Sequence, residues 1–204
     1  MNFILVNYIY LKTKISKKMI IDTIYKYEHL PILKTAKLRF SFMYETFYKK
    51  PSISLNIFET IVVNPSWLIL LLKENENYEN YFLCSVGHEL GHISKDFPTL
   101  KYIFKKNCKK CINWTNEVQH DFYSAKIIND CNRKNLVLWI KNKIILKPNN
   151  QSSSSHPSWT KRLYYAENFD FNKELIKQIA VDVNCNDQNL IYELNLFYDN
   201  IILK

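Results

Sequence analysis

A chain of 204 residues, of which 47% are hydrophobic and 15% aromatic, can bury a full core, so its length and composition exclude an intrinsically disordered protein. The net charge of +9 does not indicate a nucleic-acid-binding surface, because only three of the 28 basic residues are arginines and the lysines are scattered. No apolar run approaches the roughly 18–20 residues of a membrane span and the N-terminus lacks a signal-peptide pattern, so we expect a soluble, cytoplasmic protein.

The N-terminal third of the chain predicts one helix and a small sheet. Apolar residues at helical spacing predict a helix over 16–29 that ends before Pro31. Residues 37–47 and 52–63 each alternate between apolar and polar side chains, as strands with one buried face do. The sequence YKKPS between them is typical of a turn, so we predict an antiparallel hairpin.

The rest of the chain is predicted to be mainly helical. Asn64 and Pro65 suit the cap and the first position of a short buried helix, and the Ser-rich segment 148–155 reads as a linker. Further helices are expected over 77–95, 98–106, 115–131, 135–146 and 158–167, and as a pair within 172–202. The fold class is therefore α+β, one compact domain divided into an N-terminal helix and first strand (1–50), a central core (51–168) and C-terminal helices (169–204).

Five cysteines, an odd number, do not suggest a disulfide framework. Cys108 and Cys111 form a single CxxC without the second pair that a zinc ribbon needs. We expect this Lys-rich segment, 105–111, to be a solvated loop, and the role of the two thiols stays open.

The segment 84–96, CSVGHELGHISKD, contains the only two glycines of the chain, Gly87 and Gly91. Each directly precedes a histidine of an H-E-x-x-H motif, His88 to His92. On a helix these histidines share one face and can bind one metal ion, with zinc the best match, while Glu89 faces a metal-bound water. We predict that the glycines let a neighbouring backbone approach the site closely.

A catalytic zinc also needs a third protein ligand. The extended motif with a third histidine is absent, because position 98 is proline, so His120 or His156 would have to serve from elsewhere. Glu117 is the better candidate: Thr115 can cap a helix starting at residue 116, which places Glu117 and Asp121 on one face. Asp121 could then accept the second ring N–H of a ligand histidine.

These residues, together with the segment HPSWTKR at 156–162, resemble the gluzincin metalloproteases. The closest likeness is to the small soluble minigluzincins, relatives of the CAAX-prenyl-protease/heat-shock-protease family, and it covers roughly residues 52 to 167. The resemblance implies a zincin-like domain, in which the small N-terminal antiparallel sheet packs on helices and one helix carries H-E-x-x-H. It also implies a zinc-dependent endopeptidase that binds a peptide or protein substrate as an extended strand.

Roles follow from the resemblance position by position. It implies zinc ligands at His88, His92 and Glu117, with Glu89 as general base and then acid. It further implies that Asp121 orients His88, that His156 stabilises the oxyanion and that Arg162 braces Glu117. The substrate-binding strand would contribute Ser54, Asn56 and Phe58.

Two other functions remain open at this point. One is a regulatory metallopeptidase of the type found beside mobile-element repressors, which also carries H-E-L-G-H. The other is a zinc-stabilised module that binds a peptide without cutting it, or a latent enzyme whose cleft is filled by the first 30 residues or by helices after Phe169.

Overall fold

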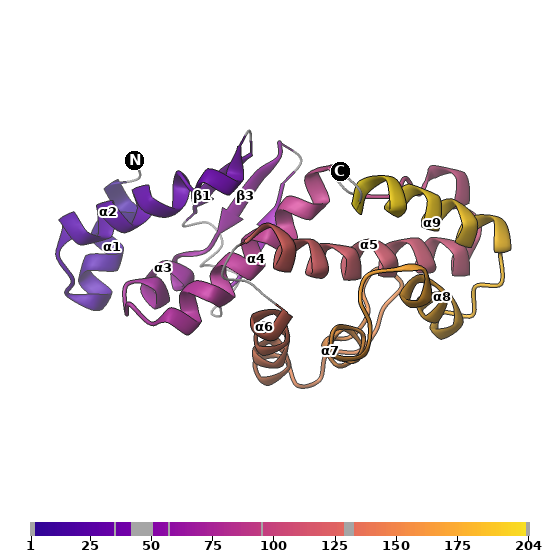
Figure 1. Ribbon diagram of the computed structural model, residues 1–204. Helices are drawn as coiled ribbons and strands as arrows, with labels where there is room; N and C mark the ends of the chain where they lie inside the picture. The colour runs from indigo at the N-terminus through magenta and orange to yellow at the C-terminus, as the bar shows by residue number, and fades with distance from the viewer. Residues whose placement is uncertain are drawn as a thin grey trace.

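The computed structural model describes residues 3–34, 36–41, 51–56, 58–94, 96–128 and 133–202. They form an α+β fold that combines helices with one small mixed sheet, which lies in the N-terminal part of the molecule (Figure 1). The elements are α1 (Phe3–Thr13), α2 (Lys17–Glu28), η1 (Pro31–Leu33), β1 (Lys37–Phe40), β2 (Ile53–Leu55), β3 (Thr60–Val63), α3 (Pro65–Leu71), α4 (Glu76–Ser94), η3 (Leu100–Tyr102), α5 (Lys106–Ile127), α6 (Arg133–Leu146), α7 (Trp159–Asn168), α8 (Lys173–Asp182) and α9 (Gln188–Ile202).

The sheet differs from the predicted antiparallel hairpin. Its order is β1-β3-β2, with β1 parallel to β3 and β2 antiparallel to β3. The predicted second strand is two strands, because the Asn56 side chain accepts hydrogen bonds from the N–H groups of Phe58 and Thr60 and closes a turn in which Glu59 has φ 53°. Alternation of apolar and polar side chains indicates a half-buried strand but does not specify which strand it pairs with, and the antiparallel prediction was wrong. The predicted first strand beyond Ser41 lies outside the described residues.

The N-terminal core joins α1, α2, the sheet, α3 and the first half of α4. The apolar N-terminus, which the sequence analysis left without structure, is helix α1, and its buried side chains pack into this core. Asn64 precedes α3 as predicted, but its side chain accepts a hydrogen bond from the Ser52 N–H and makes no cap. None of the described helices is long and apolar enough to span a bilayer.

Helices α4 and α5 lie side by side at the centre of the molecule (Figure 1), and their packing explains both glycines. A Cβ built on Gly87 would lie 2.8 Å from Ser124 Oγ and 3.0 Å from the Ser124 Cα on α5. A Cβ on Gly91 would lie 2.6 Å from Cδ2 of His120. The predicted close approach of a backbone is confirmed at Gly87, whereas at Gly91 the nearest atoms belong to the His120 side chain, and both contacts come from the helix that carries Glu117.

Helix α5 begins about nine residues earlier than predicted. Cys108 and Cys111 belong to its first turns and are buried against α8 and α9, so the predicted solvated loop was wrong. The reason is that positions i and i+3 share a helix face, and this face is apolar. Thr115 is therefore inside the helix, where its hydroxyl donates to the Cys111 carbonyl instead of capping. The predicted helix at 98–106 is reduced to the single turn η3.

Candidate metal centre and cleft

The C-terminal half of α4 and the middle of α5 bring together two imidazoles and one carboxylate. His88 Nε2 lies 3.4 Å from Oε2 of Glu117, and His92 Nε2 lies 3.5 Å from Oε1 of the same side chain. Tetrahedral ligands about 2.0–2.1 Å from one zinc ion are about 3.3–3.4 Å apart. The donor set and its spacing therefore fit a metal of this kind.

His120 adds a third imidazole to this cluster. One ring nitrogen from each of His88, His92 and His120 lies within 4.8 Å of the others, so these three residues could also hold a metal ion. His120 is completely buried, and its Nε2 lies 2.9 Å from Asp96 Oδ1 without hydrogen-bond alignment. Burial lowers the pKa of His120 to about 4, despite the Asp96 carboxylate, so the ring is neutral at pH 7. The sequence analysis named this residue only as an alternative ligand.

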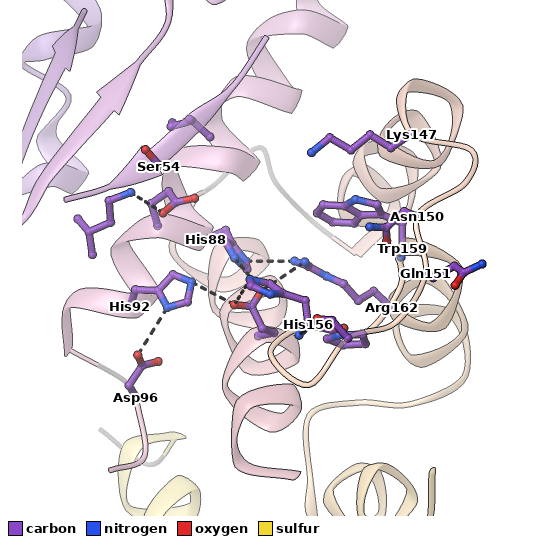
Figure 2. Close-up of a pocket in the computed structure, with 16 residues that line it drawn as sticks. Ser54, His88, His92, Asp96, Lys147, Asn150, Gln151, His156, Trp159 and Arg162 are labelled. Carbon is purple, nitrogen blue, oxygen red and sulfur yellow. Dashed lines mark hydrogen bonds and ion pairs between the residues drawn. The ribbon is translucent and has the colours of Figure 1, made fainter. Parts of the chain in front are cut away.

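Asp121 and Arg162 hold the first histidine from behind. His88 Nδ1 lies 3.0 Å from Asp121 Oδ1, and Arg162 donates from Nε to Asp121 Oδ2 at 2.8 Å and from Nη2 to Oδ1. Arg162 Nη1 is also 3.4 Å from Glu117 Oε2, and the guanidinium stacks 3.9 Å above the Trp159 ring. Figure 2 shows Arg162 reaching from α7 toward His88. One buried cation thus contacts both carboxylates of α5.

These contacts shift the titration of the buried groups. Burial acts to raise the pKa of Asp121, but the charge of Arg162 and the bond to His88 outweigh it, and the pKa is lowered. Burial is likewise outweighed at Glu117, where His156, His88 and Arg162 hold the pKa well below its ordinary value. The pKa of His88 rises to about 9 against the effect of burial, because Asp121 and Glu117 favour the imidazolium in the metal-free protein.

Asp96 is a site residue that the sequence analysis missed. Its Oδ2 lies 3.5 Å from His92 Nδ1 (Figure 2), whereas the other ring nitrogen of His92, Nε2, faces Glu117. Burial would raise its pKa, but the neighbouring imidazoles of His120 and His92 lower it to about 2. Asp96 therefore faces Nδ1 of His92 in the same way that Asp121 faces Nδ1 of His88. Residue 96 follows His92 by four positions, but α4 ends at Ser94, so helical spacing did not indicate this contact.

Glu89 lies between the candidate metal ligands and the sheet. The N–H of Leu55 donates to Glu89 Oε2 at 2.9 Å, which fixes the carboxylate beside strand β2. The backbone N–H of Asn64 donates to the Ser52 carbonyl, and the backbone N–H of Asn56 donates to the Thr60 carbonyl. The even-numbered residues along β2 therefore direct their backbone N–H and C=O groups toward β3. The backbone N–H and C=O groups of Ile53 and Leu55 consequently point away from β3. Because β2 is the edge of the described sheet, this row faces the cleft.

The predicted substrate-binding trio is not brought together. Ser54 lines the cleft, whereas Asn56 and Phe58 belong to the β2–β3 turn and do not. The amide oxygen of Asn56 is occupied within that turn, and Phe58 is 77% exposed. The alternation of the strand could not reveal that the chain reverses here.

His156 enters the cleft from the segment between α6 and α7. Figure 2 shows His156 beside His88 and Arg162. His156 Nε2 lies 3.2 Å from Glu117 Oε1, and its Nδ1 lies 2.7 Å from Ser155 Oγ. The Ser-rich segment that was predicted as a linker is ordered by its own hydrogen bonds, and Trp114 on α5 donates to its Ser153 carbonyl. It forms one wall of a cleft of about 780 Å³, whose opposite wall is β2.

No family model, curated protein or solved structure matches this chain. Its function therefore has to be argued from the site.

The site brings most of the predicted residues to one place. His88, His92, Glu89, Glu117, His156 and Arg162 line the cleft, and Asp121 lies directly behind His88. No described residue of α1, α2, α8 or α9 lines it. A cleft with a candidate metal site, a held carboxylate and an exposed strand edge can bind an extended chain and hydrolyse it.

Proposed function

We propose that this protein is a zinc-dependent endopeptidase. The observation that carries the proposal is the placement of His88 Nε2 and His92 Nε2 at 3.4 and 3.5 Å from the two oxygens of Glu117, with Glu89 beside them in the same cleft. Two imidazoles and a carboxylate are the ligands of a catalytic zinc that keeps one position open. The resemblance to minigluzincins, based on H-E-L-G-H, Glu117 and the His156–Arg162 segment, supports the same function.

Glu117 is a better third ligand than His120. Both of its oxygens face the ring nitrogens of His88 and His92, whereas Nε2 of His120 lies 2.9 Å from Asp96 Oδ1. His120 would then pack beneath the metal ligands, with its ring centroid 4.1 Å from that of His92. When bound, zinc would supply a water of lowered pKa and polarise the scissile carbonyl.

The residues of the chain have distinct tasks in this proposal. Glu89, held by the Leu55 N–H, takes the proton of the attacking water and returns it to the leaving amine. Asp121 accepts a hydrogen bond from Nδ1 of His88, which leaves Nε2 free to bind the metal. His156 donates a hydrogen bond to the oxyanion as it develops. The outward backbone groups of Ile53 and Leu55 pair with the extended substrate.

The experiment compares the wild-type protein with Glu89→Gln on a diverse peptide library, with cleavage read by mass spectrometry and metal content by elemental analysis. We expect one zinc per chain in both proteins and cleavage only by the wild type, abolished by a chelator. Glu76→Gln, at an exposed position of the same helix, is the matched control and should cleave normally.

Cleavage that persists in Glu89→Gln would overturn the proposal. Wild-type protein that contains zinc, binds peptides and cuts none of them would favour the peptide-binding module. That alternative has some support, because Glu89 already accepts a hydrogen bond from the strand edge that a substrate would approach.

A further inference from the structure

A second pocket of about 140 Å³ opens off the cleft beside the proposed general base. The two cavities share Ile53, His88, Glu89, Lys147 and Trp159, so a side chain next to the reacting bond would have direct access. A water molecule needs about 10–15 Å³ on a comparable measure, so the pocket has room for several non-hydrogen atoms. Its size suits one substrate side chain.

The pocket has apolar walls and a cationic end. Trp139 of α6 and Trp159 of α7 line it together with Lys143 and Lys147. The Lys143 ammonium lies 5.5 Å from the ring centre of Trp139, 6.0 Å from that of Trp159 and 5.8 Å from that of Trp67. Figure 2 shows Lys147 extending from the wall opposite β2 toward the cleft. The pocket therefore presents two amines, that of Lys143 on α6, which lies among indole rings, and that of Lys147 directly after the end of α6.

Neither amine is neutralised within the described part of the chain. No carboxylate there lies within 4.0 Å of Lys143 or Lys147, although Lys26, Lys101, Lys105, Lys141, Lys161 and Lys173 all have such partners. Burial, followed by the charges of Lys147 and Arg162, lowers the pKa of Lys143 to about 8. The negative charges of Glu89 and Asp121 oppose this decrease without contacting the amine, so no described carboxylate forms an ion pair with either lysine.

The carboxylates nearest the pocket make their contacts with other groups. Asp121 and Glu117 are both in contact with Arg162, and Glu89 is bonded to the edge of β2. A ligand that completes the pocket must therefore bring its own anionic group, with a short apolar stem for the indole walls. A carboxylate on one or two methylene groups has this form.

We propose that this pocket binds a substrate carboxylate, so that the enzyme cleaves next to an acidic residue, with Lys143 and Lys147 as the specificity-determining residues. The inference rests on the proposed peptidase function for its substrate class. The carboxylate can belong to an aspartate or glutamate side chain, or to the C-terminus of a peptide, and the two sources are distinguished by experiment.

The test measures peptide binding to full-length Glu89→Gln protein through the fluorescence of Trp139 and Trp159, so it does not depend on turnover. The probes are short peptides that differ only by Glu or Gln at each position in turn, each made with a free and an amidated C-terminus. We expect at least one position where Glu binds about tenfold or more tightly than Gln.

Added to that background, Lys143→Met and Lys147→Met should each reduce this preference to about threefold or less. Lys141→Met is the matched control, because Lys141 lies on the same helix and pairs with Glu167, and it should keep the preference. Thermal melts check that every variant is folded. A preference that follows the free C-terminus and is lost on amidation would assign the pocket to a terminal carboxylate.

Equal binding of Glu and Gln peptides, no binding of acidic peptides, or a preference that survives both lysine substitutions would overturn the inference. Its failure is distinguishable from that of the proposed function. Charge preference without hydrolysis by the wild type would refute the peptidase and retain the pocket, whereas hydrolysis without charge preference would do the reverse.

Discussion

Replacing Gly91 with alanine would test whether the close contact between α4 and α5 sets the geometry of the metal centre. The added Cβ would lie 2.6, 2.8 and 2.9 Å from the Cδ2, Cγ and Cβ atoms of His120. Ordinary carbon–carbon contacts are about 3.5–4.0 Å, so three atoms of one side chain would overlap with the new methyl group. His120 is completely buried and lies against His92, so its ring has no free space to enter.

Two terms of opposite sign decide the stability of this variant. Alanine gains about 1 kcal/mol over glycine in helix propensity. Overpacking a well-packed site costs about 1–3 kcal/mol, and an overlap with three atoms of a confined ring belongs in the upper half of that range. We expect a net loss of about 1–2 kcal/mol in the free energy of unfolding. This corresponds to a decrease of about 2–8 °C in Tm for a chain of this size.

The loss should be accompanied by weaker zinc binding, because Glu117 lies one helical turn before His120 and moves with it. We expect at least a tenfold decrease in affinity. Urea denaturation with and without zinc and competition with a chromophoric chelator measure the two effects. Asn80→Ala, at a partly exposed position of α4, is the control and should be stabilised by about 0.5 kcal/mol. A Gly91→Ala protein as stable as the wild type with unchanged zinc affinity would refute the reasoning.

Three further predictions concern charge at the site. Asp121→Asn should weaken zinc binding about 10- to 100-fold in the chelator assay, because His88 loses the carboxylate that orients it, and unchanged affinity would contradict this role. Folding lowers the pKa of His120 from 6.5 to about 4, so the unfolded chain binds that proton first on acidification. Metal-free protein should therefore lose about 3 kcal/mol of stability from this group between pH 7 and pH 4, and His120→Gln should lose less over the same urea series. Lys143→Met should stabilise the protein by about 1–2 kcal/mol at pH 7, because burial lowers the pKa of this partly buried amine to about 8. That gain should shrink between pH 8 and pH 10.5, where the folded wild type already holds the neutral amine, and a constant gain would point to packing instead.

Local pattern was sufficient for much of the secondary structure. The helix around the two histidines was predicted at 77–95 and is α4, and the helices expected at 135–146 and 158–167 correspond to α6 and α7. Periodicity specifies such helices because it depends on neighbours three and four positions away.

The errors of the sequence analysis were of two kinds: side-chain hydrogen bonds that close local turns, and a contact between distant segments. The mixed sheet depends on a turn closed by the Asn56 side chain, which alternation does not encode. The early start of α5 depends on apolar surface of α8 and α9 that covers Cys108 and Cys111. The Ser-rich segment before His156 is ordered by hydrogen bonds that its composition does not imply.

The sequence by itself indicated the candidate metal ligands and general base and placed His88 and His92 on one helix face, because these inferences depend on residue type and local spacing. Only the tertiary structure decided that Glu117 faces both rings, that His120 is buried under them, and that Lys143 and Lys147 meet two tryptophans beside Glu89. Those relations join residues far apart in the chain, and they are fixed by how closely α4, α5 and α6 pack. The two glycines illustrate both kinds of information. Their positions are read from the sequence, but only the structure shows that atoms of α5 occupy the space beside them.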